Sequence, residues 1–155
     1  MQTRKSRRKL KMIINNIKDS IRKSLNKMDE NLIFHFDKIL HTGFPYAYLK
    51  LNDLKIHPTA NSYKNEYIFY FQLIFQKSEE NKISELLEYQ NLVSKALLPV
   101  LSVNNKKITL DDVNFSISEK KLLMEFKMNF YVEETQDFET MQTLDITIKG
   151  GENAR

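Results

Sequence analysis

The segment from Glu66 to Gln76 constrains the fold of this 155-residue chain more than any other stretch. In an extended conformation its apolar side chains fall on both faces: Tyr67, Phe69, Phe71, Leu73 and Phe75 on one, and Ile68, Tyr70 and Ile74 on the other. Because side chains alternate along a strand, this pattern predicts a strand with two apolar faces. Such a strand is normally central in a sheet, or a partner covers its second face.

Two other segments repeat apolar residues at three- and four-residue steps, which predicts two amphipathic helices. The first is expected to end near residues 29–31, and its stripe is Leu10, Ile13, Ile14, Ile17, Ile21, Leu25 and Met28. The second is expected to start at Ser78-Glu79-Glu80, where acidic residues suit the helix dipole, and to end before Pro99. Its predicted core stripe is Ile83, Leu86, Leu87, Val93 and Leu97.

Alternating apolar residues and turn signals divide the rest of the chain into strands. The predicted strands are Leu32–Phe36, Tyr46–Leu51 with a continuation to Ile56, Glu66–Gln76, Lys107–Ser118, Lys120–Glu133 and Thr143–Ile148. Lys107–Ser118 and Lys120–Glu133 are expected to form a hairpin. The predicted fold class is α+β, with a mainly antiparallel sheet of about five to six strands and the two helices packed on one face.

The first eleven positions hold six basic residues and no acidic residue: Arg4, Lys5, Arg7, Arg8, Lys9 and Lys11. Without these six, 18 Lys and Arg residues face 20 Asp and Glu residues, so the rest of the chain is nearly neutral. We therefore divide the chain into a basic N-terminal arm (1–11), a single α+β domain (12–150) and a C-terminal tail (151–155). The arm has three interpretations: phosphate binding on a nucleic acid, docking on an acidic protein neighbour, or the solvated start of the first helix.

The sequence contains no pattern typical of a catalytic, metal or cofactor site. There is no Cys, and His35, His41 and His57 do not have the spacing of zinc ligands. Adjacent acids such as Asp111 and Asp112 point to opposite faces of a strand and do not converge on one substrate. Glycine-rich phosphate loops and long apolar spans are also missing. We expect a protein that is not an enzyme, uses no cofactor or metal, and has no membrane partner.

Tyrosines in the strands offer a competing interpretation. Tyr46, Tyr48 and Tyr70 on an exposed sheet face could stack nucleic-acid bases, as in sheet-based RNA-binding domains. The chain lacks the ribonucleoprotein sequence of those domains, and strand aromatics are more often core or interface residues. A nucleic-acid-binding module that uses the basic arm is the alternative function.

The order of elements and several short stretches resemble a known family. A helix that begins Met12-Ile13-Ile14-Asn15-Asn16-Ile17 precedes a strand and the turn Gly43-Phe44-Pro45. Two strands, a helix and a hairpin follow, and the chain closes with Met141-Gln142-Thr143-Leu144-Asp145-Ile146-Thr147-Ile148-Lys149-Gly150. Over residues 12–150 this is similar to the tail terminator, or tail completion, proteins of long-tailed phages, prophages and tailocins.

The resemblance implies a structural protein of the virion tail. Such proteins form a ring, commonly hexameric, that caps the head-proximal end of the tail tube after assembly in the bacterial host cytoplasm. The implied partners are other copies of the chain, the tail tube protein and a connector or sheath protein, with DNA at most a transient contact. The resemblance specifies neither the ring size nor the contractile or non-contractile type of tail.

Two sets of residues are expected to form contacts between copies. The basic arm is our hypothesis for a clasp, and the last strand is expected to extend a neighbour's sheet by strand addition. The residues are Arg4, Lys5, Arg7, Arg8 and Lys9 in the arm, and Thr143, Leu144, Ile146 and Ile148 in the strand.

Overall fold

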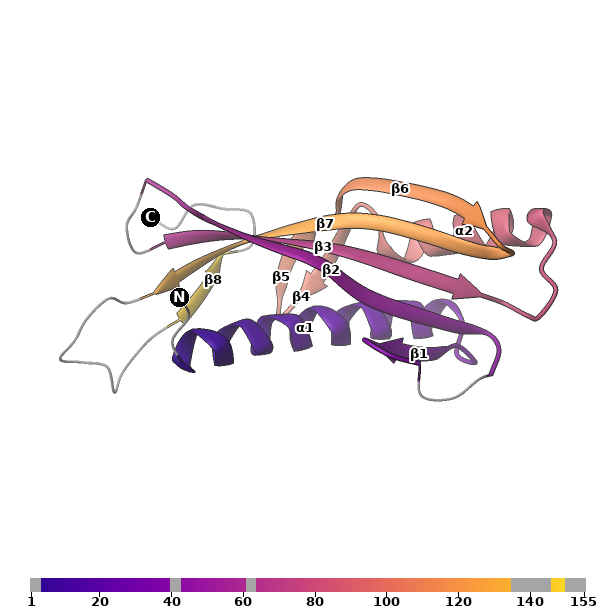
Figure 1. Cartoon of the computed structure of the whole chain (residues 1–155), viewed down its shortest axis with the longest axis horizontal. Coiled ribbons are helices and arrows are strands. Elements are labelled where there is room, and N and C mark those ends of the chain that lie inside the picture. The colour runs from indigo at the N-terminus through magenta and orange to yellow at the C-terminus, as the bar shows by residue number, and fades with distance from the viewer. Residues whose placement is uncertain (1–3, 40–42, 61–63, 135–145, 150–155) are drawn as a thin grey trace.

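A computed structural model describes residues 4–39, 43–60, 64–134 and 146–149 of the chain. Two helices lie against one side of a long, twisted sheet (Figure 1). The elements in chain order are α1 (Arg4–Met28), β1 (Ile33–Phe36), β2 (Tyr46–Pro58), β3 (Lys64–Gln76), α2 (Ile83–Leu97), β4 (Val100–Val103), β5 (Lys106–Thr109), β6 (Asp111–Ser118), β7 (Lys121–Glu134) and β8 (Ile146–Lys149). The predicted α+β class with a mainly antiparallel sheet is confirmed.

The strand with two apolar faces occupies the centre of the main sheet, whose order is β1-β2-β3-β7-β6. β3 pairs antiparallel with β2 and with β7 over almost its whole length, whereas β1 pairs parallel with β2. β6 and β8 pair with different parts of β7, at residues 121–127 and 131–134 respectively. The central place of β3 explains why its sequence is the most apolar among the strands.

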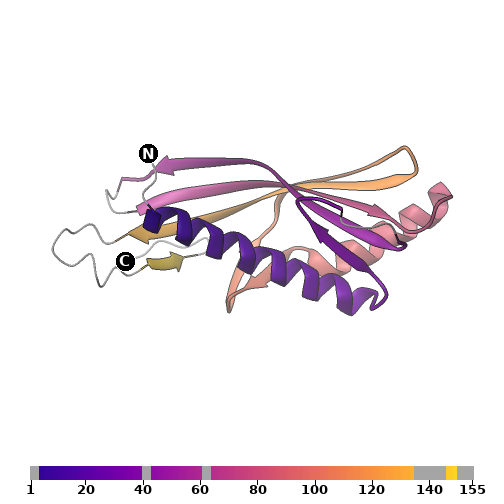
Figure 2. The same ribbon diagram turned by 60° about the horizontal axis from the view of Figure 1, so that its bottom comes forward.

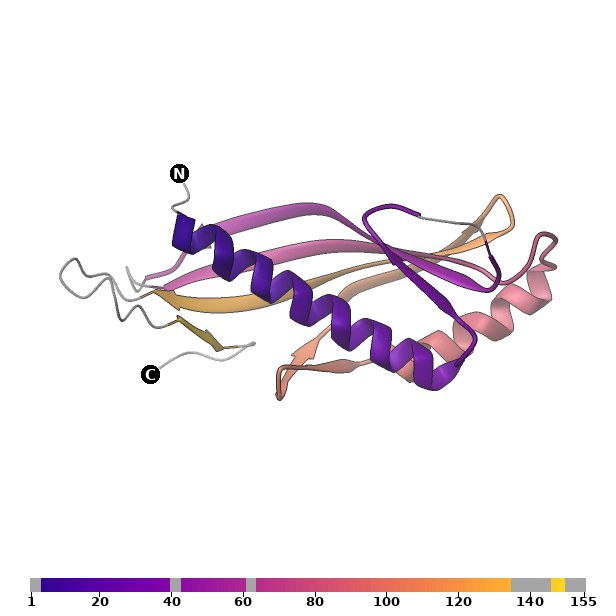
Figure 3. The ribbon, with the colours of Figure 1, turned by 90° about the horizontal axis from the view of Figure 1, so that it is seen from below.

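The core lies between the sheet and the helices. On β3 the rings of Phe69 and Phe71 stack with centroids 6.0 Å apart, and Phe71 also stacks on Phe126 of β7 at 5.6 Å. α2 packs on this same face, because the ring of Tyr89 meets Phe75 edge-on at 5.8 Å. Seen from below, α1 runs diagonally in front of the strands, and α2 lies beside the far end of α1 (Figure 3).

Helix α1 buries one stripe of branched aliphatic residues at four-residue steps: Ile13, Ile17, Ile21 and Leu25, each at most 1% exposed. It ends where predicted, since Asn31 donates its backbone N–H to the Asp29 side chain and Leu32 donates to the Asp29 carbonyl. Its start differs from the prediction. The helix begins at Arg4, so its first turns include most of the predicted arm, and no structural boundary falls at residue 11.

Helix α2 begins at Ile83, after rather than within the acidic pair of residues 79–80. The backbone N–H of Lys82 donates a hydrogen bond to the Glu85 carboxylate at 3.1 Å. Backbone N–H groups at the start of a helix have no partner within the helix, and this bond supplies one. The prediction of the core stripe was wrong for two residues, because Ile83 is 65% exposed and Leu87 is 50% exposed. The buried set is Leu86, Tyr89, Val93 and Leu97. The stripe is narrower than predicted because only one side of α2 meets the sheet.

The predicted hairpin from residue 107 to residue 133 is only partly correct. β6 and β7 form it, but residues 106–109 form a separate strand, β5, which pairs with β4 in a small second sheet. Asn104 and Asn105, both with positive φ (51° and 66°), make the two-residue turn between β4 and β5. The chain therefore has eight strands in its described part instead of the predicted six.

Candidate interaction surfaces

The face of the sheet turned away from the helices is a surface of mixed apolar and charged side chains. We call it the open face, because the described chain covers the sheet on the helix side only (Figure 2). Cross-strand neighbours on this face include Ile74 with Leu123 and Tyr70 with Lys127. All four side chains are half-buried. Apolar and aromatic groups that strands hold in fixed rows, with charges between them, are typical of protein contact surfaces.

One end of the open face carries a polar cluster built on Glu66. Its carboxylate accepts hydrogen bonds from the Asn129 amide at 2.8 Å and from the Tyr131 hydroxyl at 3.4 Å. Burial, and then the Glu66 charge, raise the pKa of Tyr131, so its hydroxyl stays protonated and keeps donating. The Lys64 ammonium lies 5.3 Å from the centre of the Tyr131 ring. These contacts tie β3 to β7 and hold the tyrosine in place.

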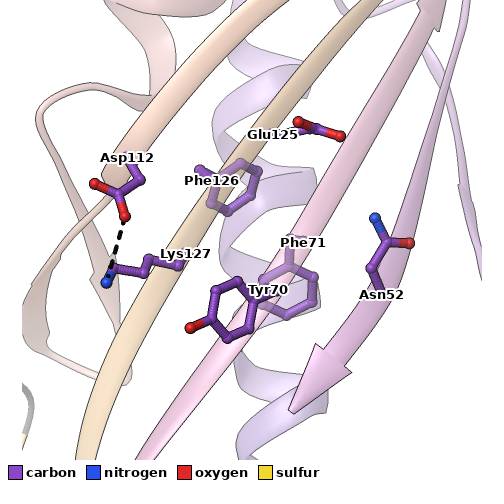
Figure 4. Close-up of a pocket in the computed structure, with 7 residues that line it drawn as sticks. All are labelled: Asn52, Tyr70, Phe71, Asp112, Glu125, Phe126 and Lys127. Atoms are coloured by element: carbon purple, nitrogen blue, oxygen red, sulfur yellow. Dashed lines mark ion pairs between the residues drawn. The ribbon is translucent and has the colours of Figure 1, made fainter. Parts of the chain in front are cut away.

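A depression of about 250 Å³ lies near the middle of the open face (Figure 4). It forms where both neighbouring strands bulge, β2 between Leu51 and Asp53 and β6 between Asp111 and Asn114. Bulges bend a strand locally, which opens space beside the regular pairs. Its lining residues are Asn52, Tyr70, Phe71, Asp112, Glu125, Phe126 and Lys127.

The charges in this depression partly neutralise one another. The Asp112 carboxylate lies 3.4 Å from the Lys127 ammonium, and this hydrogen bond raises the pKa of Lys127. Asp112 is largely exposed to water and Lys127 is partly exposed, so the pair adds little stability. The rings of Phe71 and Phe126 belong to the core face, so the aromatic side chain on this side is Tyr70. A tyrosine with both signs of charge beside it suits a polar contact with another protein surface.

The base-stacking interpretation depends on three tyrosines, and the hydroxyl groups of two of them are hydrogen-bonded within the chain. Tyr46 is 8% exposed and donates to the Gln76 amide oxygen at 2.9 Å. Tyr48 donates to the carbonyl of Asp37 at 2.6 Å. Tyr70 lies beneath the Lys55 ammonium, at 5.3 Å. Tyr46 and Tyr48 are therefore fixed within the sheet, whereas Tyr70 is part of the open face.

The predicted basic residues lie on α1, but they do not form one free set. Arg7 and Arg8 are exposed, whereas Lys9 is only 3% exposed and belongs to the packed side of the helix. Arg4 and Lys5 lie in the first helical turn. The basic character also extends past the predicted arm, to the exposed Lys23 and Lys27. The solvent side of α1 is thus basic at both ends.

The predicted terminal strand is present in part, as β8. Residues 146–149 pair antiparallel with residues 131–134 of β7 in the same chain. Ile146 and Ile148 thus extend the chain's own sheet, and the predicted addition to a neighbour's sheet would use the other edge of β8. Thr143 and Leu144 lie outside the described residues.

Sequence reasoning missed a groove between the C-terminal parts of the two helices. It encloses about 450 Å³ and is lined by Ser24, Lys27 and Met28 of α1 and by Leu92, Lys95 and Ala96 of α2. Leu92 is 46% exposed and stands outside the buried stripe of α2. An apolar residue outside the predicted stripe was the feature of the sequence that could have indicated this groove. We call this feature the helix groove.

The two histidines in the described part of the chain, His35 and His57, show no arrangement for metal binding. His35 is buried in β1 with its ring edge-on to Tyr46 at 5.9 Å, and His57 is exposed at the end of β2. His41 lies outside the described residues. Within the described ranges, no three His, Cys, Asp or Glu side chains are grouped as metal ligands would be. Among those same residues, no helix is long and apolar enough to cross a membrane.

Comparisons with known proteins leave the chain without an assigned family. No protein-family model matches it, and no curated protein matches it. One solved structure, whose name states no function, is similar with a TM-score of 0.33 and 10% sequence identity. That match covers 77% of this chain and 96% of the other. At this score the likeness supports no conclusion about fold or function.

Proposed function

We propose that this protein is a structural subunit of a phage or tailocin tail, a tail terminator that forms a closed ring of several copies. The observation that carries the proposal is the open face: β3 is apolar on both faces, and the described chain covers only one of them. Ile74, Leu123 and Tyr70 remain half-buried beside charged neighbours. Covering such a surface with a second copy would remove its apolar area from water, at about 25 cal/mol for each Å².

The exposed part of α2 supports the same proposal. Ile83 and Leu87 are both exposed and stand one helical turn apart, on the same side of the helix. Leu92 and Ala96, each nine residues further on, line the helix groove beside α1. Nine residues correspond to about two and a half turns, so Ile83 and Leu87 point away from α1. The chain therefore has separate apolar surfaces, as a head-to-tail ring requires.

In this proposal the ring caps the tail tube at its head-proximal end and stops further polymerisation. One face of the ring contacts the tube protein, and the other contacts the connector or, in a contractile tail, the sheath. The ring assembles in the host cytoplasm and remains in the virion tail. The chain performs no catalysis and needs no cofactor in this role.

Light scattering coupled to size-exclusion chromatography, followed by negative-stain imaging, tests the proposal. We expect a closed ring from the full chain, and monomers from the double variant Ile74→Glu, Leu123→Glu. Thr109→Glu, at an exposed position of the small second sheet, is the control and is expected to leave the ring intact. A full-length chain that stays monomeric at every concentration tested would refute the ring.

A second candidate function is nucleic-acid binding by α1. The observation that favours it is the exposure of Arg7, Arg8 and Lys11 on the first three turns of the helix. Basic side chains that neutralise phosphates give an affinity that falls steeply as salt rises. A monomer that binds duplex DNA tightly at low salt, and loses this on replacement of these three residues by Gln, would favour this candidate over the ring.

A further inference from the structure

The helix groove combines an apolar floor with positive charge at its rim. Met28, Leu92 and Ala96 provide the apolar part, and the exposed Lys27 and Lys95 stand on opposite helices. The six lining residues include no carboxylate. Such a groove suits an acidic segment that also carries apolar side chains, as in helix-in-groove recognition.

The chain itself contains a segment with this chemistry. Residues 135–145 carry three acids, Asp137, Glu139 and Asp145, and no basic residue. The same eleven residues carry three large apolar side chains at three-residue steps: Phe138, Met141 and Leu144. The segment therefore has the opposite charge to the rim of the helix groove, and it carries apolar side chains that suit the apolar floor.

The length of this segment prevents it from reaching the groove of its own chain. Its two ends are joined, because Glu134 at the end of β7 pairs with Ile146 at the start of β8. A loop closed at its base extends about half its contour length, roughly 20 Å here. β8 lies beside the start of α1, whereas the groove lies at the other end of the helix (Figures 1 and 3). The helix spans about 30 Å between Arg4 and Ser24, which is more than the loop can cover.

We propose that residues 135–145 of one copy dock in the helix groove of the next copy. This rests on the proposed ring and names a contact that builds it. The residues that flank the segment, Glu134 and Ile146, pair far from the helix groove, so each copy can give one contact and receive one. A contact of this heterologous kind closes into a ring when the rotation between copies allows it.

Charge reversal on the two surfaces tests the contact, with the full chain and light scattering as the readout. We expect Lys27→Glu with Lys95→Glu to weaken assembly about tenfold or more, because two attractive rim pairs become repulsive. The reciprocal change, Asp137→Lys with Glu139→Lys, is expected to do the same. Combining all four changes in one chain restores opposite charges and should restore assembly. Lys77→Glu, at an exposed lysine before α2, is the control and should assemble normally.

Leu92→Asn tests the apolar part separately. The side chain is 46% exposed, so the fold should be kept while assembly weakens at least severalfold. Circular dichroism of each variant checks the fold directly.

The results separate this contact from the ring itself. If the full chain forms a ring and the groove variants assemble as well as it does, the docking proposal is wrong and the ring stands. If the four changes together fail to restore assembly that each pair abolished, the docking proposal is also wrong. If the full chain is monomeric throughout, both proposals fall.

Discussion

At the scale of single residues, buried polar side chains with several partners matter more than surface charges. Asn81 is 8% exposed, and it joins two distant turns of the chain. Its amide N–H groups donate to the carbonyls of Ser78 and Lys120, both at 3.0 Å. Its oxygen accepts from the backbone N–H of Ser78 at 3.1 Å. Asn81 thus connects the approach to α2 with the turn between β6 and β7.

Asn81→Ala should therefore destabilise the protein by about 2–3 kcal/mol, because buried carbonyl and N–H groups lose their partners. Asn91→Ala is the matched control, since Asn91 is exposed on α2, and it should change stability by less than about 0.5 kcal/mol. Urea unfolding followed by circular dichroism measures both. Equal effects of the two variants would show that Asn81 does not connect the turns as described.

Tyr89 provides a prediction about alkaline pH. Burial, and then the nearby Asp29 carboxylate, raise its pKa above the ordinary value of 10.0. In the unfolded chain Tyr89 loses its proton near pH 10, while the folded protein retains it. The unfolded state thus binds fewer protons above pH 10, and stability falls as pH rises through that range.

Tyr89→Phe removes this linkage. At pH 7 the variant should be less stable by about 0.5–1 kcal/mol, because it loses one long hydrogen bond, of 3.4 Å, to Asp29. Between pH 9 and pH 11 the variant should lose less stability than the parent protein, so the difference should shrink. Urea unfolding at pH 7, 9, 10 and 11 measures this. A difference that widens with pH would contradict the assigned direction.

At the scale of elements, two hairpins share a turn geometry but differ in turn chemistry. Asn104-Asn105 closes the β4–β5 hairpin, and Glu119-Lys120 closes the β6–β7 hairpin with φ values of 51° and 63°. Positive φ at both central residues suits Asn and Gly, whereas longer side chains are strained there. The β6–β7 turn therefore keeps an unfavourable sequence in a conformation that the flanking strands impose.

Glu119→Asn with Lys120→Gly should stabilise the protein by about 1 kcal/mol or more, because both residues then tolerate positive φ. The Lys120 carbonyl that Asn81 binds is backbone and is retained. Asn105→Gly is the comparison, and it should help less because Asn already accepts this conformation. Thermal unfolding compares the three proteins. No gain from the double change would show that the turn has another geometry.

At the scale of the whole molecule, the stability of the sheet is concentrated at β3 and β7. These strands pair with each other along most of their length, and their inner faces supply most of the buried aromatic rings. β1 has four residues and, within the described residues, pairs on one side only, and β6 is exposed at alternate positions. Unfolding should therefore begin at the edges of the sheet and reach the centre last.

Native-state hydrogen exchange tests this order. The backbone amides of Phe69, Phe71 and Leu73 in β3 should exchange at the rate of global unfolding. Amides of β1 and the outer edge of β6 should exchange at least tenfold faster through local opening. Uniform exchange over all strands would indicate a sheet that opens as a single unit.

Much of this fold was predictable because local patterns and tertiary structure agree. The two-faced apolar segment predicted a central strand, and the helix of residues 10–28 was predicted from its four-residue repeat. β7 was predicted from its alternation. In each case the residue pattern has one period over many residues, and a single packing surface satisfies it.

The sequence by itself determined the type of each long element, the α+β class and the central place of the 66–76 strand. The physical reason is that a periodic row of apolar side chains has to be buried against another surface. Only the tertiary structure decided which candidates stay exposed. Ile83 and Leu87 fit a helical stripe as well as Leu86, but the width of the contact with the sheet selected Leu86. The β4–β5 pairing and the helix groove likewise depend on which segments meet in space, and spacing along one chain does not specify that.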